Sequence, residues 1–161
     1  MQIDAIDPAL DLVLERTVPV PPQAVWDAWT TPSQLVQWFT PRPWSTVECD
    51  IDLRPGGVFR TVMRSPEGKE FDNPGCYLLV EPGRRLVFTD ALGPGFRPQA
   101  EPFMTAEIIL APDGDGTRYR AIVRHADPAA RKRHEEMGFF DGWGTALDQL
   151  VELVSSERDR S

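Results

Sequence analysis

The chain has 161 residues and carries 25 acidic against 17 basic side chains, a formal net charge of −8 at neutral pH. A chain of this length can bury roughly two thirds of its unfolded surface, so we expect one domain over residues 1–161 with a core at about 9–155. The negative charge repels nucleic-acid phosphates and anionic lipid headgroups, which excludes both as expected partners. The N-terminus is acidic where a signal peptide is basic, and we expect a cytoplasmic protein with no membrane association.

The first part of the chain predicts a strand followed by two short helices. Apolar and polar residues alternate over residues 9–18, which is typical of a strand. The segment PPQAVWDAWT, residues 21–30, begins with prolines that a first helical turn tolerates and then spaces its apolar residues along one helical face. Thr31 is expected to cap a second short helix, with Trp38 on its buried side.

From Ser45 onward the apolar period changes to two. The segment STVECDIDL, residues 45–53, places apolar residues on one face and acids on the other, as in an antiparallel sheet with one wet face. Further strands are expected around Phe59, Leu79, Phe88, Ala106 and Ala121. The segments between them are rich in Gly and Pro, and the longest, residues 92–102, is either a lid over a binding site or a plain connection.

Residues 134–154 predict one long closing helix. Its apolar residues recur at spacings of three and four, at Met137, Phe140, Trp143, Leu147, Leu150, Val151 and Val154. Gly138, Gly142 and Gly144 interrupt this segment, and each weakens a helix by roughly 1 kcal/mol relative to Ala. Two explanations stay open: the glycines border a cavity, or they allow close packing against a sheet.

These elements together predict an α+β helix-grip fold. The order is a strand, two short helices, a run of strands and a long helix. A curved antiparallel sheet of about six or seven strands with one wet face must cover its other face, and the long C-terminal helix is the element able to do so.

Four segments in order resemble a known family. They are VWDAWTTPSQLVQWF, ECDIDLRPGGVFR, GCYLLVEPGRRLVFT and MGFFDGWGTALDQL, and the resemblance runs from about Leu12 to Leu153. The family is named for the activator of the ninety-kilodalton heat-shock protein's ATPase (AHSA-type) and belongs to the START-like, or SRPBCC, superfamily. The resemblance implies a pocket between the sheet and the C-terminal helix. Members include lipid and hormone carriers, aromatic polyketide cyclases and small bacterial domains without known ligands.

The chain departs from the co-chaperone that gives the family its name. That protein has a separate N-terminal domain with an asparagine- and tryptophan-rich motif, and nothing in this sequence resembles the motif. A heat-shock chaperone is therefore not an expected partner. A stress-related role that modulates such a chaperone is kept as a second alternative function.

The leading functional prediction is the binding of a small, mainly hydrophobic or aromatic molecule. Ligand pockets are largely apolar, and methionine adapts to irregular shapes. The expected ligand-binding residues are those whose faces should converge under the last helix: Trp38, Phe59, Met63, Phe88, Met104, Met137, Phe140, Trp143 and Gly144.

The first alternative is a cyclase- or hydrolase-type enzyme acting on a carbonyl. If Phe88 faces inward, alternation turns Asp90 inward too, and Ala121 does the same for His125. A carboxylate and an imidazole at the mouth of a pocket could exchange protons with one substrate. Otherwise both side chains cap strand ends in water.

Other chemical motifs are absent from the sequence. It has no GxSxG elbow, phosphate-binding loop, HExxH or dinucleotide-binding GxGxxG. We therefore expect no cofactor and no metal site, and we expect Cys49 and Cys76 to be buried thiols. The acidic residues Glu48 and Asp50 predict that the outer face of the sheet is charged and exposed to solvent. A weak homodimer contact through this face is the one protein–protein interaction that we keep as an expectation.

Overall fold

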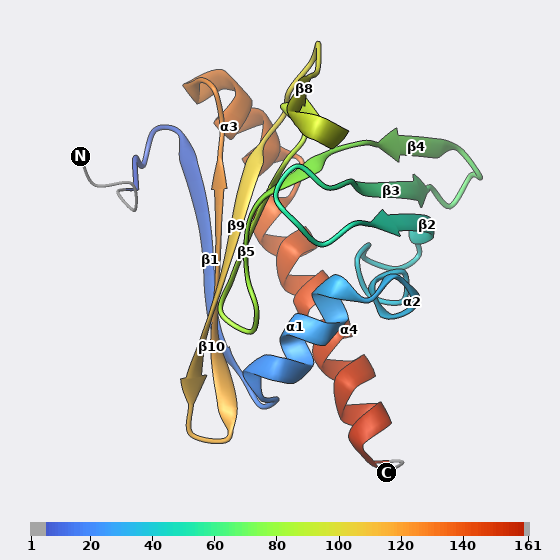
Figure 1. The fold of residues 1–161 in the computed structure, drawn as a ribbon, viewed down its shortest axis with the longest axis vertical. Helices are drawn as coiled ribbons and strands as arrows, with labels where there is room; N and C mark the ends of the chain where they lie inside the picture. The colour runs from blue at the N-terminus through green and yellow to red at the C-terminus, as the bar shows by residue number, and fades with distance from the viewer. Residues whose placement is uncertain (1–5, 160–161) are drawn as a thin grey trace.

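The computed structural model describes residues 6–159 (Figure 1). In chain order its elements are β1 (Asp11–Val18), α1 (Pro22–Thr30), α2 (Pro32–Leu35), β2 (Ser45–Ile51), β3 (Phe59–Arg64), β4 (Glu70–Asn73), β5 (Cys76–Glu81), β6 (Arg85–Thr89), β7 (Leu92–Gly93), the 3-10 turn η1 (Pro94–Phe96), β8 (Arg97–Pro98), β9 (Thr105–Asp113), β10 (Gly116–Arg124), α3 (Pro128–Glu136) and α4 (Phe139–Asp159). This is the predicted α+β helix-grip arrangement, with two short helices after the first strand and a long helix at the end.

The largest sheet is antiparallel and has the strand order β1-β10-β9-β6-β5. Its register aligns Leu14 with Ala121, Ala121 with Ile108, and Ile108 with Leu86. These four residues are buried and form an apolar row across the inner face. Because side chains alternate along a strand, the neighbouring positions point to the opposite, outer face.

Strands β2, β3 and β4 form a second antiparallel sheet, which continues the first one. Three backbone hydrogen bonds join the segments around β3 and β5. Phe59 N–H donates to the Gly75 carbonyl and Tyr77 N–H donates to the Gly57 carbonyl, each over 3.0 Å, and Gly56 N–H donates to the Tyr77 carbonyl over 2.8 Å. Figure 1 shows the smaller sheet turning away from the larger one, so that both partly enclose α4.

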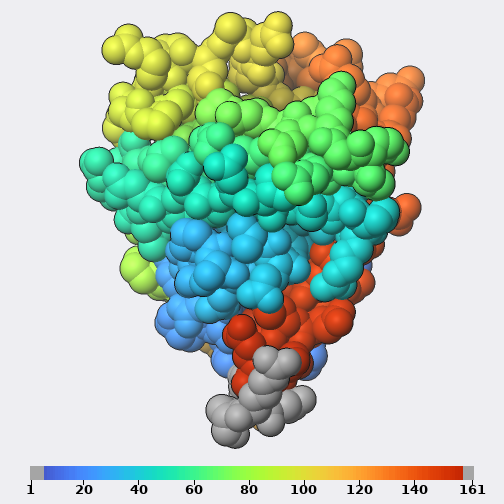
Figure 2. Space-filling model, turned by 90° about the vertical axis from the view of Figure 1, so that its right-hand side faces the viewer, coloured from blue at the N-terminus to red at the C-terminus, as the bar shows by residue number. Residues whose placement is uncertain are grey.

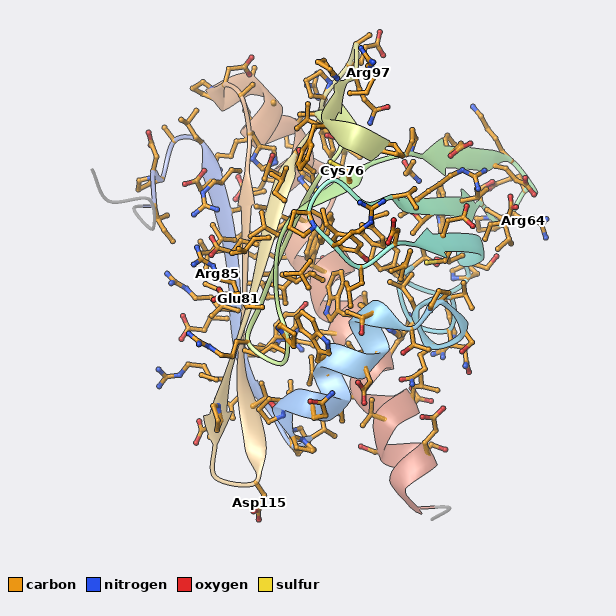
Figure 3. The ribbon with its side chains drawn as sticks, viewed as in Figure 1. Arg64, Cys76, Glu81, Arg85, Arg97 and Asp115 are labelled. Atoms are coloured by element: carbon orange, nitrogen blue, oxygen red, sulfur yellow. The ribbon has the colours of Figure 1, made fainter. Side chains whose placement is uncertain are left out.

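The outer face of the large sheet is charged. Glu107 on β9 is buried and makes ion pairs with Arg85 on β6 and Arg124 on β10. Figure 3 shows Arg85 and Glu81 on the side of this sheet turned away from α4. On the small sheet, Arg60 binds carboxylates from both neighbouring strands, and Figure 3 places Arg64 at the far end of that sheet.

The helices cover the inner faces of the sheets. Helix α1 buries Val25, Trp26, Ala28 and Trp29, and the later turns of α4 bury residues such as Leu147 and Leu150 in the same core. Figure 2 shows α1 and α2 in blue below the teal and green small sheet, with the red α4 emerging beneath them. Within residues 6–159, no helix combines the length and the apolar character needed to cross a bilayer.

The predicted single helix over residues 134–154 is wrong at its start, because the chain breaks between α3 and α4. His134 belongs to α3, and Gly138 separates the two helices with a φ of +95°. A positive φ just after the last helical turn is the usual place for a glycine, since residues with a Cβ are strained there. Gly138 therefore serves the turn between two helices.

Several short elements also differ from the prediction. Helix α2 ends at Leu35, so Trp38 follows it in a turn, and Thr31 precedes it without a side-chain capping bond. The described chain has ten strands because β4, β7 and β8 are added, each four residues or shorter. Such strands are too short to show a period of two. The predicted loop at residues 92–102 contains the small β7–β8 hairpin.

Candidate functional site: an aromatic cavity under the C-terminal helix

A cavity of about 620 Å³ lies between the two sheets and the first turns of α4. Its walls are mostly apolar. The lining side chains and backbone come from Trp29, Trp38, Phe39, Thr40, Pro41, Trp44, Phe59, Thr61, Met63, Asn73, Pro74, Gly75, Phe88, Thr89, Asp90, Phe103, Met104, Tyr119, His134, Met137, Gly138, Phe139, Gly142, Trp143, Ala146 and Leu147.

Contacting aromatic rings build the inner wall. The Trp29 and Trp38 ring centroids lie 4.9 Å apart in an edge-to-face arrangement, and Trp29 also contacts Phe88 at 5.7 Å. Phe59 meets Phe88 edge-to-face at 4.8 Å. Edge-to-face pairs are favourable because the positive edge of one ring meets the negative face of the other. The wall is therefore well packed, although its rings come from helix α1, the turn after α2, and strands β3 and β6.

Gln149 of α4 holds the turn that carries Trp38. Its amide nitrogen donates to the carbonyls of Trp38 and Thr40 over 2.9 and 2.8 Å, and its oxygen accepts from the Arg42 backbone N–H over 3.0 Å. The Trp38 indole N–H in turn donates to the Ala28 carbonyl over 3.0 Å. A buried glutamine thus satisfies three backbone groups that no helix or strand could pair.

The more exposed part of the lining is also apolar. Trp44 is exposed, and its ring centroid lies 5.6 Å from that of Phe71. Met137, which precedes the α3–α4 turn, is 69% exposed and still borders the cavity. An exposed methionine beside an apolar opening suits contact with ligands of differing shape, because its thioether side chain is flexible.

Two threonine hydroxyls of the lining bind threonines that lie outside it. The hydroxyls of Thr40 and Thr46 lie 3.0 Å apart, and Thr89 shares a 2.8 Å hydrogen bond with Thr105. Burial raises the pKa of the Tyr119 phenol, so this hydroxyl stays neutral at physiological pH. The Trp29 indole N–H points near that hydroxyl without forming a hydrogen bond of normal geometry.

A histidine pair lies at one wall. His125 Nδ1 is 2.8 Å from the Leu10 carbonyl oxygen, and His125 Nε2 is 2.9 Å from His134 Nδ1. Both side chains are only 7% exposed. Burial, together with the nearby His125, lowers the pKa of His134 to about 4. His134 is therefore neutral at physiological pH.

The structure brings most of the predicted ligand-binding residues to this cavity. Those that line it are Trp38, Phe59, Met63, Phe88, Met104, Met137 and Trp143. Phe140 and Gly144 are not among the lining residues. Phe140 is 45% exposed, and its neighbour Phe139 lines the cavity instead, because successive helical residues point in different directions.

Gly144, which the sequence placed beside the cavity, faces β1 and is not among the lining residues. A Cβ added there would meet the guanidinium group of Arg16. Arg16 donates a 2.7 Å hydrogen bond to Asp148, one turn further along α4. The missing side chain leaves room for this arginine. Gly142 is the helical glycine that borders the cavity, and a Cβ there would approach only Pro41, at 4.0 Å.

Of the two residues that the sequence offered as an acid–base pair, Asp90 borders the cavity and His125 is not among its lining residues. Asp90 lines the cavity, and its Oδ1 accepts hydrogen bonds from the backbone N–H groups of Phe103 and Met104 over 2.8 and 3.0 Å. His125 lies behind His134, with both ring nitrogens engaged. The carboxylate thus orders the chain leading into β9, and His134 stands between His125 and the cavity.

Several lining residues were missed from the sequence. His134 lies nine positions after His125 across a strand end and a helix, a spacing that neither a period of 3.6 nor a period of two detects. Phe103 lies in the irregular segment before β9, where no period exists. Phe139 offered a signal, since it begins the aromatic run after Gly138.

Side chains of the kinds that ligate metals do not cluster in the described part of the chain. Residues 6–159 contain no group of three His, Cys, Asp or Glu side chains placed to hold an ion. Cys49 and Cys76 are free thiols, and burial, followed by the nearby Asp50 carboxylate, raises the pKa of Cys49 to about 11. Its thiol is therefore protonated and weakly nucleophilic at physiological pH.

Comparison with known proteins adds a family and a fold. The profile of the family described as Activator of Hsp90 ATPase homolog 1-like protein matches residues 19–155. Among curated proteins, none matches the chain significantly.

Three solved structures are similar over nearly their whole lengths. A protein from Nitrosomonas europaea is 50% identical, with 96% of this chain and 99% of that chain covered and a TM-score of 0.93. A protein from Rhodobacter sphaeroides is 25% identical, with 94% and 97% covered and a TM-score of 0.81. The AHSA1 protein from Silicibacter pomeroyi is 28% identical, with 91% and 99% covered and a TM-score of 0.69.

Proposed function

Because this chain belongs to the Activator of Hsp90 ATPase homolog 1-like family, of START-like fold, we propose that it binds a small, mainly hydrophobic or aromatic molecule in the cavity beneath α4. The family sets the fold but not the ligand, since one fold hosts many functions. The proposal therefore depends on the site itself.

The observation that carries the proposal is the aromatic lining of a large open space. Its volume of about 620 Å³ falls within the roughly 300–1,000 Å³ common for small-molecule sites. Water in such a space finds few hydrogen-bond partners on the rings of Trp38, Phe59 and Phe88. An apolar molecule that displaces this water gains the contacts that water cannot make.

Binding is better supported than acid–base catalysis by the predicted pair. The Asp90 carboxylate already accepts two backbone hydrogen bonds, and His125 has both nitrogens engaged away from the cavity. General acid–base catalysis requires both groups within hydrogen-bond reach of one substrate. This pair lacks that arrangement, so we place the carbonyl-directed enzyme second.

Titration with 2-methoxynaphthalene, a neutral bicyclic probe, tests the proposal. Ligand-observed NMR detects binding from the signals of the probe. Four of the lining residues are tryptophans, so the NMR signals of their indole N–H groups report binding from the protein. The Gly142→Leu variant should fill the cavity from α4 and weaken binding at least about tenfold. Thr145→Leu is the matched control, because Thr145 lies on the same helix and is exposed.

The expected result is saturable binding that Gly142→Leu weakens and Thr145→Leu leaves within about twofold. Native mass spectrometry of the purified protein would show in parallel whether a cellular molecule co-purifies. Absence of binding by the unmodified protein, or equal loss in both variants, would contradict the proposed function.

A further inference from the structure

We propose that the ligand of this cavity carries a hydrogen-bond donor, an aromatic hydroxyl or ring N–H, and donates it to Nε2 of His134. The inference rests on the proposed function and adds a chemical class to it. Its basis is the histidine pair, whose hydrogen bonds leave one nitrogen of His134 as an acceptor.

The direction of each hydrogen bond in the pair follows from the Leu10 carbonyl. A carbonyl oxygen can only accept, so His125 carries its proton on Nδ1, which lies 2.8 Å from that oxygen. In a neutral imidazole the other nitrogen is then an acceptor. With an uncharged His125, His134 Nδ1, 2.9 Å away, donates to His125 Nε2, which leaves His134 Nε2 without a proton.

Nε2 of His134 is the ring nitrogen left open. His134 lines the cavity, whereas His125, which holds Nδ1, does not. Within residues 6–159, no side chain or backbone group forms a hydrogen bond with Nε2, although the residue is only 7% exposed. Nε2 is not fully enclosed by protein atoms, so a water-sized group can reach it.

The surroundings keep this imidazole neutral. Burial is the larger influence on its pKa, and the neighbouring His125 ring adds to it. The last turn of α3 favours a cation, since helix C-termini carry partial negative charge. That influence is weaker here than burial, because the pKa is lowered overall. An acceptor rather than a cation therefore faces the ligand.

The rings around His134 indicate an aromatic donor. Its centroid lies 4.6 Å from that of Phe103, 5.2 Å from Phe139 and 6.5 Å from Trp143. A flat ring bearing a hydroxyl or N–H could contact these side chains while its donor reaches Nε2. A ligand without a donor would bury that nitrogen unpaired, and a site with an unpaired polar group discriminates against such a ligand.

The experiment compares 2-naphthol with 2-methoxynaphthalene, in which a methyl group replaces the hydroxyl hydrogen and removes the donor; the variants below separate the loss of the donor from the added bulk. At pH 7 the unmodified protein should bind 2-naphthol about 3- to 10-fold more tightly, the range expected for one neutral hydrogen bond. Nitrogen-15 NMR of the imidazoles provides a readout without ligand. The chain has only two histidines, and both should show a protonated Nδ1 and an unprotonated Nε2.

Two variants at the same position separate the acceptor from the histidine pair. His134→Asn places an amide N–H near the Nδ1 position, so it can still donate to His125, but it has no atom near Nε2. His134→Gln places an amide oxygen near Nε2. The preference for 2-naphthol should fall to about onefold in His134→Asn and persist in His134→Gln. Thr61→Val, which removes a hydroxyl from another part of the lining, should keep the preference whatever it does to both affinities.

The outcomes distinguish the two proposals. Equal affinity of the unmodified protein for both compounds, or a protonated Nε2 on His134, would overturn this inference and leave the proposed function standing. Loss of the preference in Thr61→Val but not in His134→Asn would also overturn it. Failure of both compounds to bind the unmodified protein would overturn the proposed function and this inference together.

Discussion

Replacing Gly142 by alanine should stabilise the protein, although the residue lies in an aromatic-rich helix that packs against α1 and β1. Gly142 has an ordinary helical φ within α4, and an added Cβ would find one neighbour, Pro41 Cγ, at 4.0 Å. That distance is normal van der Waals contact. The methyl group therefore enters the cavity without displacing any atom.

The size of the effect follows from helix propensity. Alanine is more favourable than glycine by up to about 1 kcal/mol per residue in a helix, and here no steric cost opposes the gain. For a chain of this size, a stabilisation of about 1 kcal/mol raises the melting temperature by about 2–4 °C. Differential scanning calorimetry or thermal unfolding followed by circular dichroism measures the shift directly.

Gly138→Ala is the matched control, since it makes the same chemical change four residues earlier. Gly138 has a φ of +95°, and this conformation costs a residue with a Cβ about 1–2 kcal/mol even where nothing crowds it. The two substitutions should therefore shift the melting temperature in opposite directions. A fall in melting temperature for Gly142→Ala, or equal shifts in both variants, would refute the reasoning and the position given to the cavity.

Three further predictions concern other parts of the site. Gly144→Ala should change the melting temperature little. The gain in helix propensity is offset because the methyl group displaces the exposed Arg16–Asp148 ion pair, a contact worth about 0–1 kcal/mol. A large drop in melting temperature would show tighter packing at Gly144 than the structure has. Gln149→Leu should lower the free energy of unfolding by about 1–3 kcal/mol in a denaturant titration, since the Trp38 and Thr40 carbonyls lose their buried donor. An unchanged free energy of unfolding would argue against a stabilising role for Gln149. The pKa of His134 is about 4 when folded and near 6.5 when unfolded, so the unfolded chain binds more protons between these values and stability should fall as the pH falls from about 6.5 to 4. His134→Asn should flatten part of that fall, and parallel curves for both proteins would contradict the lowered pKa.

The sequence by itself determined the order and type of the main elements. Alternation over residues 9–18 and in the later strands reflects one buried and one wet sheet face, a constraint that acts along each strand separately. The helical spacing of residues such as Leu147, Leu150 and Val154 likewise follows from burying one side of α4. The resemblance in four ordered segments agrees with the family match.

Local patterns were weaker at the ends of elements. The sequence predicted that Gly138 lies within a helix, because the apolar spacing continues on both sides of it. The positive φ of Gly138 separates α3 from α4. Strands as short as β7 and β8 contain too few residues for a period to appear. At Gly138 the backbone conformation of one residue decided the outcome, and the apolar spacing does not determine that conformation.

Only the tertiary structure decided which side chains meet. The three glycines near the start of α4 lie close together in the sequence, yet they differ in role: Gly138 forms a turn, Gly142 lies within the helix beside the cavity, and Gly144 makes room for Arg16 on β1. The histidine pair joins the end of β10 to α3 through a hydrogen bond that depends on how a strand and a helix are packed. Such relations depend on the curvature of the sheet and the direction of each Cα–Cβ bond, which are set by the packing of all elements together and leave no periodic trace along the chain.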